Sequence, residues 1–275
     1  MDSRPDAHTA LYCVLGDPIA HSLSPVMHNR AFAHRRMNAV YLALRVTDLE
    51  AAVRGLRALG IKGASITLPH KTRVMDYLDV IDPVAAAIGA VNTIVNDGGR
   101  LIGKNSDASG AVDALRAATA IAAKNVLIIG AGGAARAVGF GVRTAGGNIT
   151  IANRSPEAGN ELAAALDGAS LPLAELAVDH FDIIINTTPV GMHPAIYASP
   201  VPNACFSTHM VVMDIIYNPL ETALLKAAGH AGCRTIDGLA MFVNQGACQF
   251  EWWTGEKAPV ETMRQAVMDK LQEAR

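Results

Sequence analysis

The sequence predicts an α/β protein of two domains, the second built on a doubly wound parallel sheet. Two observations support this prediction. The chain has 275 residues, more than a single core usually organises, and 51% of them are hydrophobic, enough to bury a large interior. Short aliphatic runs alternate with segments of helical length, as they do where strands are covered by helices on both faces.

The amino-terminal part is expected to open with a strand over residues 11–16 and a helix from Ser24 to about Met37. Ser24 suits the N-cap of this helix, and Pro25 suits its first turn. Further elements follow up to residue 103: a strand over 40–45, a helix from the Thr47–Glu50 capping box to Leu59, a strand over 63–67, a helix with Lys71 in its first turn, a short helix between Asp82 and Gly89, and a hairpin with strands 91–95 and 100–103.

From residue 105 onward a helix is expected to lead toward Lys124, and strands and helices then alternate strictly. The predicted strands are 126–129, 148–152, 181–187, 210–215 and 233–236, and the predicted helices are 133–145, 156–166 and 218–228. This alternation predicts one Rossmann-type unit. Two closing helices, 238–254 and 259–274, are expected to return to the first domain. The expected domains are therefore 1–108, completed by 238–275, and 109–237.

A glycine turn connects the strand over 126–129 to the helix that follows it. Such a turn brings unpaired backbone N–H groups and the positive end of a helix to one point, which binds phosphate. The same turn can also serve only to pack a helix on a sheet, but the length of the βαβ segment and the small residue Ala135 favour a dinucleotide. The residues expected to bind the phosphates are Gly130, Ala131, Gly132, Gly133 and Ala134.

The end of the second strand indicates which dinucleotide is bound. An acidic residue there usually holds the ribose hydroxyls of NAD. Here Asn153, Arg154 and Ser155 follow instead, and a cation beside a hydroxyl suits a 2′-phosphate. The sequence therefore predicts NADP.

Composition excludes several other classes of protein. The net charge is −2 without a basic run, no apolar segment is long enough to span a bilayer, and the amino terminus lacks a signal-peptide pattern. We therefore expect neither a nucleic-acid partner nor a membrane. The four cysteines never form C-x-x-C, which is typical of a reduced cytoplasmic protein, and the nine histidines show no ligand spacing, so no metal site is expected.

Five polar residues of the amino-terminal part allow two interpretations each. Ser22 and Ser24 suit turn and cap chemistry, but they also follow a strand, where α/β proteins bind ligands. Lys71 is expected in the first turn of a helix, where the dipole disfavours a cation, so it is either solvated or held for chemistry. Asn92 lies in an apolar strand and can satisfy backbone groups. Asp107 can be a simple partner of a helix dipole.

Taken in order, the motifs resemble those of the shikimate dehydrogenase family across nearly the whole chain. The matching segments are Gly16–Pro25, Ile66–Lys71, Gly89–Thr93, Gly103–Asp107, Gly130–Arg136, Asn153–Ser155, Asn186–Met192, Tyr217–Pro219, and Asp237–Leu239 with Gln245.

The resemblance implies NADP-dependent interconversion of shikimate and 3-dehydroshikimate in aromatic amino-acid biosynthesis, in a cleft between a substrate domain and a nucleotide domain, by a monomer or a homodimer. The roles it implies are as follows: Ser22 and Ser24 bind the substrate carboxylate, Thr67, Asn92 and Gln245 bind ring hydroxyls, Lys71 and Asp107 form the catalytic pair, and Thr187 and Gly238 join the residues that bind the cofactor. Oxidising a secondary alcohol requires a group that takes the hydroxyl proton, which a lysine shared with a carboxylate can do.

Three positions depart from the family pattern. Ser65 stands where asparagine is frequent, Ala108 where glycine is usual, and Ala158 where a second arginine is expected near the 2′-phosphate. Two alternatives therefore stay open: a relative that acts on quinate or a similar ring acid with NAD or NADP, and a nucleotide-binding regulatory module without catalysis. Lys71 and Asp107 argue against the regulatory module, which needs neither.

Overall fold

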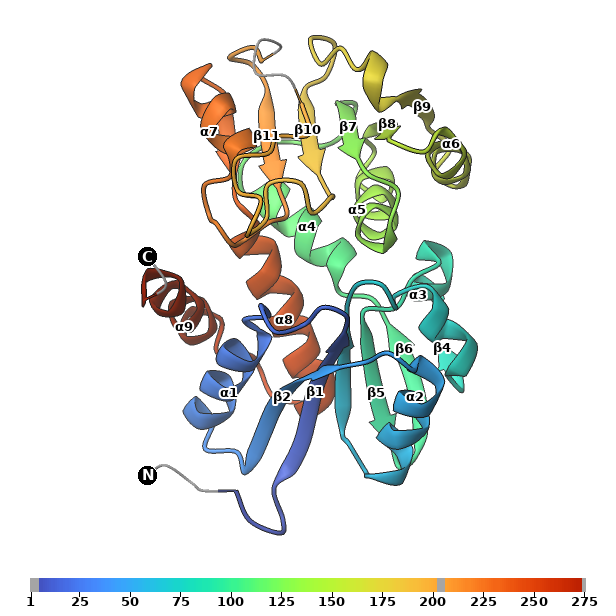
Figure 1. Cartoon of the computed structure of the whole chain (residues 1–275), viewed down its shortest axis with the longest axis vertical. Coiled ribbons are helices and arrows are strands. Elements are labelled where there is room, and N and C mark those ends of the chain that lie inside the picture. Colours follow the sequence, from blue (N-terminus) through green and yellow to red (C-terminus); the bar gives the residue numbers. More distant parts are fainter. Residues whose placement is uncertain (1–4, 202–205, 274–275) are drawn as a thin grey trace. The chain divides into compact units, whose positions relative to one another are not determined.

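The computed structural model describes residues 5–201 and 206–273, and the chain divides into two compact units (Figure 1). Unit 1 contains the chain up to residue 106 together with the chain from residue 245 onward, and unit 2 contains residues 107–244. None of the helices in the described ranges is long and apolar enough to cross a membrane.

Unit 1 is built on a mixed sheet of six strands in the order β2-β1-β3-β5-β6-β4. The strands are β1 (Ala10–Gly16), β2 (Ala39–Arg45), β3 (Gly63–Ile66), β4 (Val80–Ile81), β5 (Thr93–Asp97) and β6 (Arg100–Lys104). β1 is parallel to β2 and β3, whereas β5 is antiparallel to both β3 and β6. The hairpin turns at Gly98 and Gly99, which both have positive φ, as the sequence predicts.

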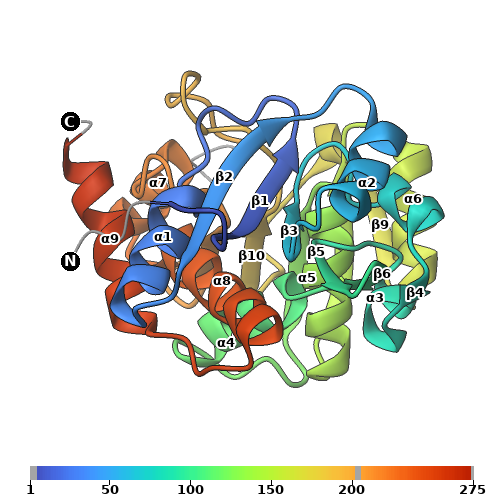
Figure 2. The ribbon, with the colours of Figure 1, turned by 90° about the horizontal axis from the view of Figure 1, so that it is seen from below.

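Helices cover both faces of this sheet (Figure 2). Their bounds are α1 (Ser24–His34), α2 (Leu49–Ala58), the 3₁₀ helix η1 (Arg73–Tyr77), α3 (Pro83–Ile88), α9 (Val260–Glu273) and the second part of α8 (Gly238–Thr254). An aliphatic core packs between the sheet and α2, η1 and α3. The opposite face is aromatic: Tyr12 of β1 contacts Phe32 of α1 and Trp253 of α8, with ring centroids 5.0 and 5.4 Å apart.

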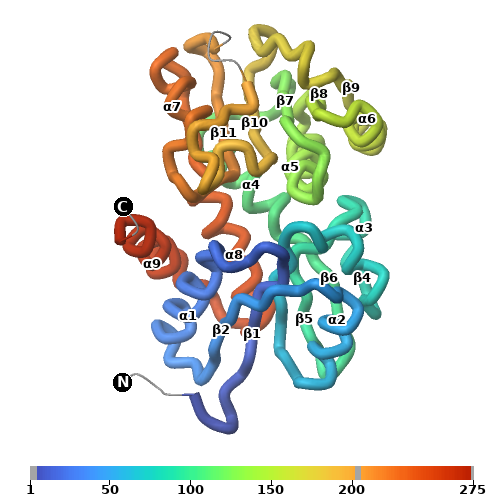
Figure 3. Tube along the Cα trace, viewed as in Figure 1, coloured from blue at the N-terminus to red at the C-terminus, as the bar shows by residue number. Residues whose placement is uncertain are grey.

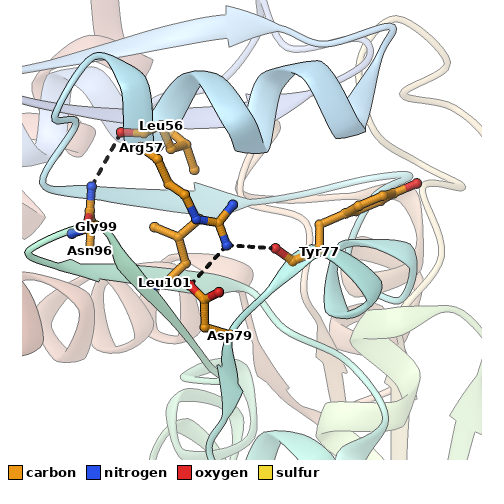
Figure 4. A network of polar contacts seen from close by, with 7 residues as sticks. All are labelled: Leu56, Arg57, Tyr77, Asp79, Asn96, Gly99 and Leu101. Atoms are coloured by element: carbon orange, nitrogen blue, oxygen red, sulfur yellow. Dashed lines mark hydrogen bonds and ion pairs between the residues drawn. The ribbon is translucent and has the colours of Figure 1, made fainter.

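A polar network ties α2 to the chain that follows it in unit 1 (Figure 4). The Arg57 guanidinium donates to the Tyr77 carbonyl at 3.2 Å and to the Asp79 carboxylate at 2.9 Å, and Asp79 also accepts from the Leu101 N–H at 2.7 Å. Asn96 of β5 donates to the Leu56 carbonyl at 3.3 Å. These bonds connect a helix, a 3₁₀ helix and a hairpin. They therefore hold together the side of the sheet that is formed by β5, β6 and β4.

Unit 2 is built on a parallel sheet of six strands in the order β12-β11-β10-β7-β8-β9. Figure 3 labels the segments of this sheet from β11 to β9. The strands are β7 (Asn125–Ile129), β8 (Asn148–Asn153), β9 (Ala169–Pro172), β10 (Ile183–Asn186), β11 (Val211–Asp214) and β12 (Arg234–Ile236). Numbered within the unit, this is the order 3-2-1-4-5-6 of a dinucleotide-binding sheet read from its other edge. The prediction of a doubly wound Rossmann-type domain is confirmed.

Helices cover both faces of the second sheet as well. They are α4 (Asp107–Arg116), α5 (Gly133–Thr144), α6 (Pro156–Ala165), α7 (Ala223–His230) and the first residues of α8. One core packs beneath α4, α5 and α6 and includes Met241 of α8, and a second core packs beneath α7. Because Met241 is buried in unit 2, the division falls inside α8, after residue 244.

Two strands were not predicted. β4 has only two residues, and β9 has four, ending at Pro172, which cannot donate a ladder hydrogen bond. β9 pairs with β8 over residues 169–172 at the edge of the sheet, where a proline is tolerated. The nucleotide sheet therefore has six strands rather than five, because an edge strand needs neither length nor a continuous apolar run.

Several predicted helix starts were wrong. Ser24 is the first residue of α1 rather than its cap, and Asp48, not Thr47, caps α2 by accepting from the Ala51 N–H at 3.0 Å. α7 begins at Ala223 rather than Asn218, because the Thr222 hydroxyl caps it by accepting from the Leu225 N–H at 3.3 Å. Lys71 lies in a turn before a five-residue 3₁₀ helix. The expectation that a helix dipole disfavours its positive charge therefore does not apply.

Candidate active site

The strand directions of unit 1 bring several predicted residues to one edge of its sheet. β1 and β3 are parallel, so the loops after Gly16 and Ile66 leave on the same side. β5 is antiparallel to β3 and begins on that side, and β6 ends there. The segments with Ser22, Thr67, Asn92 and Ser106 therefore share one edge of the sheet.

Backbone hydrogen bonds fix the turn that carries Thr67 and Lys71. The Thr67 N–H donates to the Leu15 carbonyl at 3.0 Å, and the His70 N–H donates to the Thr67 carbonyl at 2.9 Å. The Lys71 carbonyl accepts from the Val91 N–H at 2.8 Å. Both residues are half-buried, so their side chains leave a backbone that is tied to β1 and to the start of β5.

Asn92 is 2% exposed and connects the start of β5 to the end of β6. Its Oδ1 accepts from the Ser106 N–H at 2.9 Å and from the Thr93 hydroxyl at 2.7 Å. Its backbone N–H donates to the Lys104 carbonyl at 3.1 Å, and its carbonyl accepts from the Ile66 N–H at 2.7 Å. The expectation that Asn92 satisfies backbone groups is confirmed, and its Nδ2 donates to the Ser106 hydroxyl at 3.0 Å.

The two serines differ in their bonding. The Ser22 Oγ accepts from the Ser24 N–H at 3.3 Å, so Ser22 rather than Ser24 supports the start of α1. The Ser24 side chain is 7% exposed, and none of the residues in 5–201 and 206–273 hydrogen-bonds to its hydroxyl. This leaves the Ser24 hydroxyl suited to an anionic ligand.

Gln245 and Gln249 lie four residues apart on α8 and therefore share a face of the helix. Gln249 is buried and donates to the Thr93 hydroxyl at 3.0 Å. Gln245, which is half-buried, thus lies on the helix face that meets the start of β5.

In unit 2 the chain reverses its strand order between β7 and β10, and ligands bind at such a switch point. Gly130 follows β7, and Thr187 follows β10. The Thr187 hydroxyl donates to the Ile129 carbonyl at 2.7 Å. Gly130 has φ 114°, and a Cβ built on it would lie 2.7 Å from the Thr187 Oγ1, so only glycine fits beside Thr187.

The start of α5 fits an anionic group. Gly132 is the N-cap, no side chain caps the helix, and its first turn contains no acidic residue. A Cβ built on Gly132 would meet no atom within 4 Å, so a ligand can approach the backbone closely. With Ala131, Gly133 and Ala134, this turn offers N–H groups and a positive helix end to a pyrophosphate.

The predicted 2′-phosphate residues end β8 as expected, but their bonding differs among them. Arg154 is exposed and makes no ion pair with any residue of the described ranges. The Ser155 hydroxyl donates to the Glu157 carboxylate at 2.9 Å, and Asn153 donates to the Ser155 carbonyl at 3.0 Å. Within this described segment Arg154 is thus a cation available to a ligand. The nearby Glu157 carboxylate would repel a phosphate.

Asp107 and Gly238 open helices α4 and α8. Asp107 is 5% exposed, which is unusual for a carboxylate. A Cβ built on Gly238 would lie 2.3 Å from the Ile215 carbonyl oxygen, so this glycine has a packing reason of its own beside the predicted cofactor role. No group of three potential metal ligands is present among residues 5–201 and 206–273.

Three residues at the site were missed from sequence: Thr93, Ser106 and Gln249 all bond directly to Asn92 or to its hydroxyl partner. The only available signal for Gln249 was its spacing of one helical turn from Gln245. Nothing in a linear reading joins it to Thr93, 156 residues away.

A buried carboxylate organises the loops after β10 and β11. The Asp214 Oδ1 accepts from the Asn186 Nδ2 and the Ile216 N–H, both at 3.1 Å, and its Oδ2 accepts from the Thr222 hydroxyl at 2.8 Å. Burial raises the pKa of Asp214 to about 6, against the opposing effect of these donors.

This raised pKa predicts a pH-dependent stability. The unfolded chain ionises near pH 3.8 and the folded chain near 6, so Asp214 contributes stability that is lost as the pH rises between these values. The Asp214→Asn variant should lose this dependence. Its free energy of unfolding relative to wild type should therefore rise between pH 4 and 7, by on the order of 3 kcal/mol.

Urea denaturation at several pH values measures this difference. The exposed Asp97→Asn variant controls for the change in net charge. A relative stability of Asp214→Asn that stays constant with pH would contradict the prediction.

The strand order and glycine turn of unit 2, together with the lysine, amide and hydroxyl groups at one sheet edge of unit 1, define a two-domain, nicotinamide-dependent oxidoreductase. Three family profiles match the chain: "Shikimate dehydrogenase substrate binding domain" over residues 14–94, "Shikimate / quinate 5-dehydrogenase" over 113–240 and "Shikimate 5'-dehydrogenase C-terminal domain" over 238–268. The chain belongs to the shikimate dehydrogenase family.

Relatives cover almost the entire chain. The shikimate dehydrogenase (NADP(+)) of Moorella thermoacetica is 49% identical over 96% of this chain and 93% of its own length. A shikimate dehydrogenase crystallised with NADP+ has a TM-score of 0.93 at 43% identity and covers 98% of both chains. The Thermus thermophilus enzyme in complex with NADP(H) and shikimate has a TM-score of 0.88 at 35% identity, covering 95% of this chain and 99% of its own.

Proposed function

We propose that this chain catalyses the reversible, NADP-dependent reduction of 3-dehydroshikimate to shikimate. The observation that supports this most directly is the sheet edge of unit 1. It gathers Thr67 and Lys71, which follow β3, and Asn92, which precedes β5, and offers a small polyhydroxylated acid several fixed donors and acceptors. The relatives named above share this activity by name.

The residue roles follow from this proposal. Ser22 and Ser24 bind the substrate carboxylate, while Thr67, Asn92 and Gln245 bind ring hydroxyls. Bound NADP+ would supply the acceptor for the hydride that leaves the carbon carrying the reacting hydroxyl. Lys71 takes the proton of that hydroxyl at Nζ, and Asp107 stabilises the ammonium group that forms. In the direction of reduction, Lys71 returns the proton.

The residues proposed to hold NADP come from four segments of unit 2. The turn from Gly130 to Ala134 binds the pyrophosphate, and Asn153, Arg154 and Ser155 bind the adenosine 2′-phosphate. Thr187 and Gly238 complete the set. The start of α5, which no side chain caps, supports this assignment, as does Arg154, which forms no ion pair within the described ranges.

An absorbance assay of the reduced nicotinamide tests the function by crossing shikimate and quinate with NADP and NAD. We expect the highest kcat/KM for shikimate with NADP. A higher value for quinate with NAD would establish the alternative ring-acid dehydrogenase. Absence of turnover with every pair would sink the proposal.

We further infer a cytoplasmic enzyme, either a monomer or a homodimer. Burial raises the pKa of the Cys13 thiol to about 12, so this thiol stays protonated and unreactive. Light scattering decides the oligomeric state.

Ser24→Ala should raise KM for shikimate about tenfold while kcat and the melting temperature change little. The Ser24 hydroxyl bonds to none of the described residues, so its loss costs the fold little, whereas a bond to a carboxylate contributes about 1.5–3 kcal/mol. Ser22→Ala should raise KM and also lower the melting temperature, because Ser22 supports α1. Steady-state kinetics and calorimetry separate the two effects. An unchanged KM for Ser24→Ala would remove Ser24 from the carboxylate site.

A further inference from the structure

A chain of buried hydrogen bonds crosses the core of unit 1 and ends on Asn92. The Tyr41 hydroxyl donates to the Ser65 Oγ at 2.5 Å, and the Ser65 hydroxyl donates to the Gln249 Oε1 at 2.8 Å. The Gln249 Nε2 donates to the Thr93 Oγ1 at 3.0 Å, and the Thr93 hydroxyl donates to the Asn92 Oδ1 at 2.7 Å. All five residues are at most 6% exposed.

The direction of every bond in this chain is fixed by one backbone group. The Ser106 N–H can only donate, so the Asn92 atom that faces it at 2.9 Å is the oxygen. Thr93 must then donate its proton to that oxygen, which leaves its own oxygen to accept from the Gln249 amide nitrogen. The Gln249 oxygen therefore faces Ser65.

The consequence for Asn92 is a single amide orientation. The Ser106 N–H and the Thr93 hydroxyl donate to its oxygen, and its Nδ2 faces the Ser106 Oγ at 3.0 Å. Asn92 can therefore meet a ring oxygen of the substrate only as a hydrogen-bond donor. A glutamine at 249 reinforces this orientation, because its amide donates to the Thr93 oxygen, which leaves the Thr93 proton for Asn92, and at the same time accepts from Ser65.

The surroundings of Gln249 add no charge of their own. His28 of α1 stacks on Tyr41 of β2, with ring centroids 4.5 Å apart, and Tyr12 of β1 contacts Trp253. Burial lowers the pKa of His28 to about 3, against a smaller opposing effect of the neighbouring Gln249 amide, so the ring is neutral. Near Asn92, at the other end of the hydrogen-bond chain, the Lys104 ammonium lies 4.8 Å from the centroid of the Trp252 ring and 3.9 Å from the Asp82 carboxylate.

We propose that Gln249 is a positioning residue that acts through Thr93 to hold Asn92 as a hydrogen-bond donor to the substrate. This role rests on the proposed function, since it requires that Asn92 binds the ring acid. It also gives Ser65 a purpose: its short side chain leaves room for Gln249 and orients the amide.

Gln249→Glu tests this role because it changes hydrogen positions and almost no shape. When the introduced carboxylate is ionised, it accepts from both neighbours, so the Thr93 proton turns toward it and leaves the Asn92 oxygen. When the introduced carboxyl is protonated, it donates to Thr93 and restores the wild-type pattern. Burial raises the pKa of such a carboxyl, so both forms are reached between about pH 5 and 8.

We expect the Kd for shikimate, measured by calorimetry, to be about tenfold weaker than wild type at pH 8. The ratio to wild type should return toward one as the pH falls. Thr93→Val should weaken binding at every pH, and Thr93→Ser, which keeps the hydroxyl, should bind like wild type. Exposed Gln265→Glu on α9 is the matched control and should show no change.

A Gln249→Glu Kd ratio that is the same at pH 5 and pH 8 would overturn the inference, as would wild-type binding by Thr93→Val. Melting temperatures confirm that each variant is folded, and Thr93→Ser against Thr93→Val decides the matter if Gln249→Glu does not fold. If the wild-type protein neither binds nor turns over shikimate, the result contradicts the proposed function rather than the role of Gln249. The two failures are therefore distinguishable.

Discussion

Replacing Lys71 by alanine is expected to lower kcat for shikimate oxidation by about 10²–10⁴-fold, the range in which positioned acid–base groups act. KM should change little, because proton transfer belongs to the transition state rather than to the bound substrate. Lys71 follows β3 in a turn whose backbone is tied to Val91, so the substitution removes a side chain without loosening the strand. Steady-state kinetics in both directions measure the effect.

Asp107→Asn should also lower kcat strongly, and the double variant should lose much less than the two single losses combined, because residues that act as a unit are not additive. Lys62→Ala is the matched control, since Lys62 is exposed and precedes the same strand. A Lys71→Ala enzyme with nearly full kcat would reduce Lys71 to a surface lysine.

Arg154→Asp should reverse the choice of cofactor, lowering the ratio of kcat/KM for NADP over NAD by about 100-fold or more. The substitution removes a charge-assisted partner of the 2′-phosphate, which contributes about 1.5–3 kcal/mol, and adds a repelling carboxylate. In the wild type, Glu157 beside Ser155 and Ala158 in place of a second arginine limit the preference for NADP. We therefore expect the wild-type preference for NADP over NAD to lie near the lower end of the range of about 1.5–3 kcal/mol.

Arg54→Asp on α2 of unit 1 controls for the charge reversal and should leave the ratio unchanged. Equal kcat/KM values for NADP and NAD in the wild type would show that Arg154 does not bind the 2′-phosphate.

The nucleotide unit was predictable because its signals are local. The buried run of β7, the glycine turn and the start of α5 are contiguous in the sequence, and the parallel topology follows from the alternation of strands and helices. Where a local signal was weak, the prediction failed. β9 is a short edge strand that ends in proline. α7 was expected to begin at the Asn218–Pro219 pair, but it begins after Thr222, whose hydroxyl caps the helix.

The candidate site was predictable one residue at a time but not as a network. Asn92 could be recognised as a polar residue beside an apolar strand, yet its oxygen is held by Thr93 and Ser106. Lys71 was expected in a helix, but the segment after it forms only a 3₁₀ turn. Bonds such as Gln249 to Thr93 depend on packing between distant segments, which a single sequence does not display.

The discontinuity of unit 1 has a consequence for synthesis on the ribosome. Unit 2 is one continuous segment and can fold as soon as residue 244 has emerged, while the sheet of unit 1 still lacks part of its cover. The aromatic residues of β1 and α1 pack against Phe250 and Trp253, which are synthesised near the end of translation. The first residues to be translated therefore complete their fold last, and a nascent chain stopped before α8 exposes Tyr12 and Phe32 as an apolar surface for chaperones.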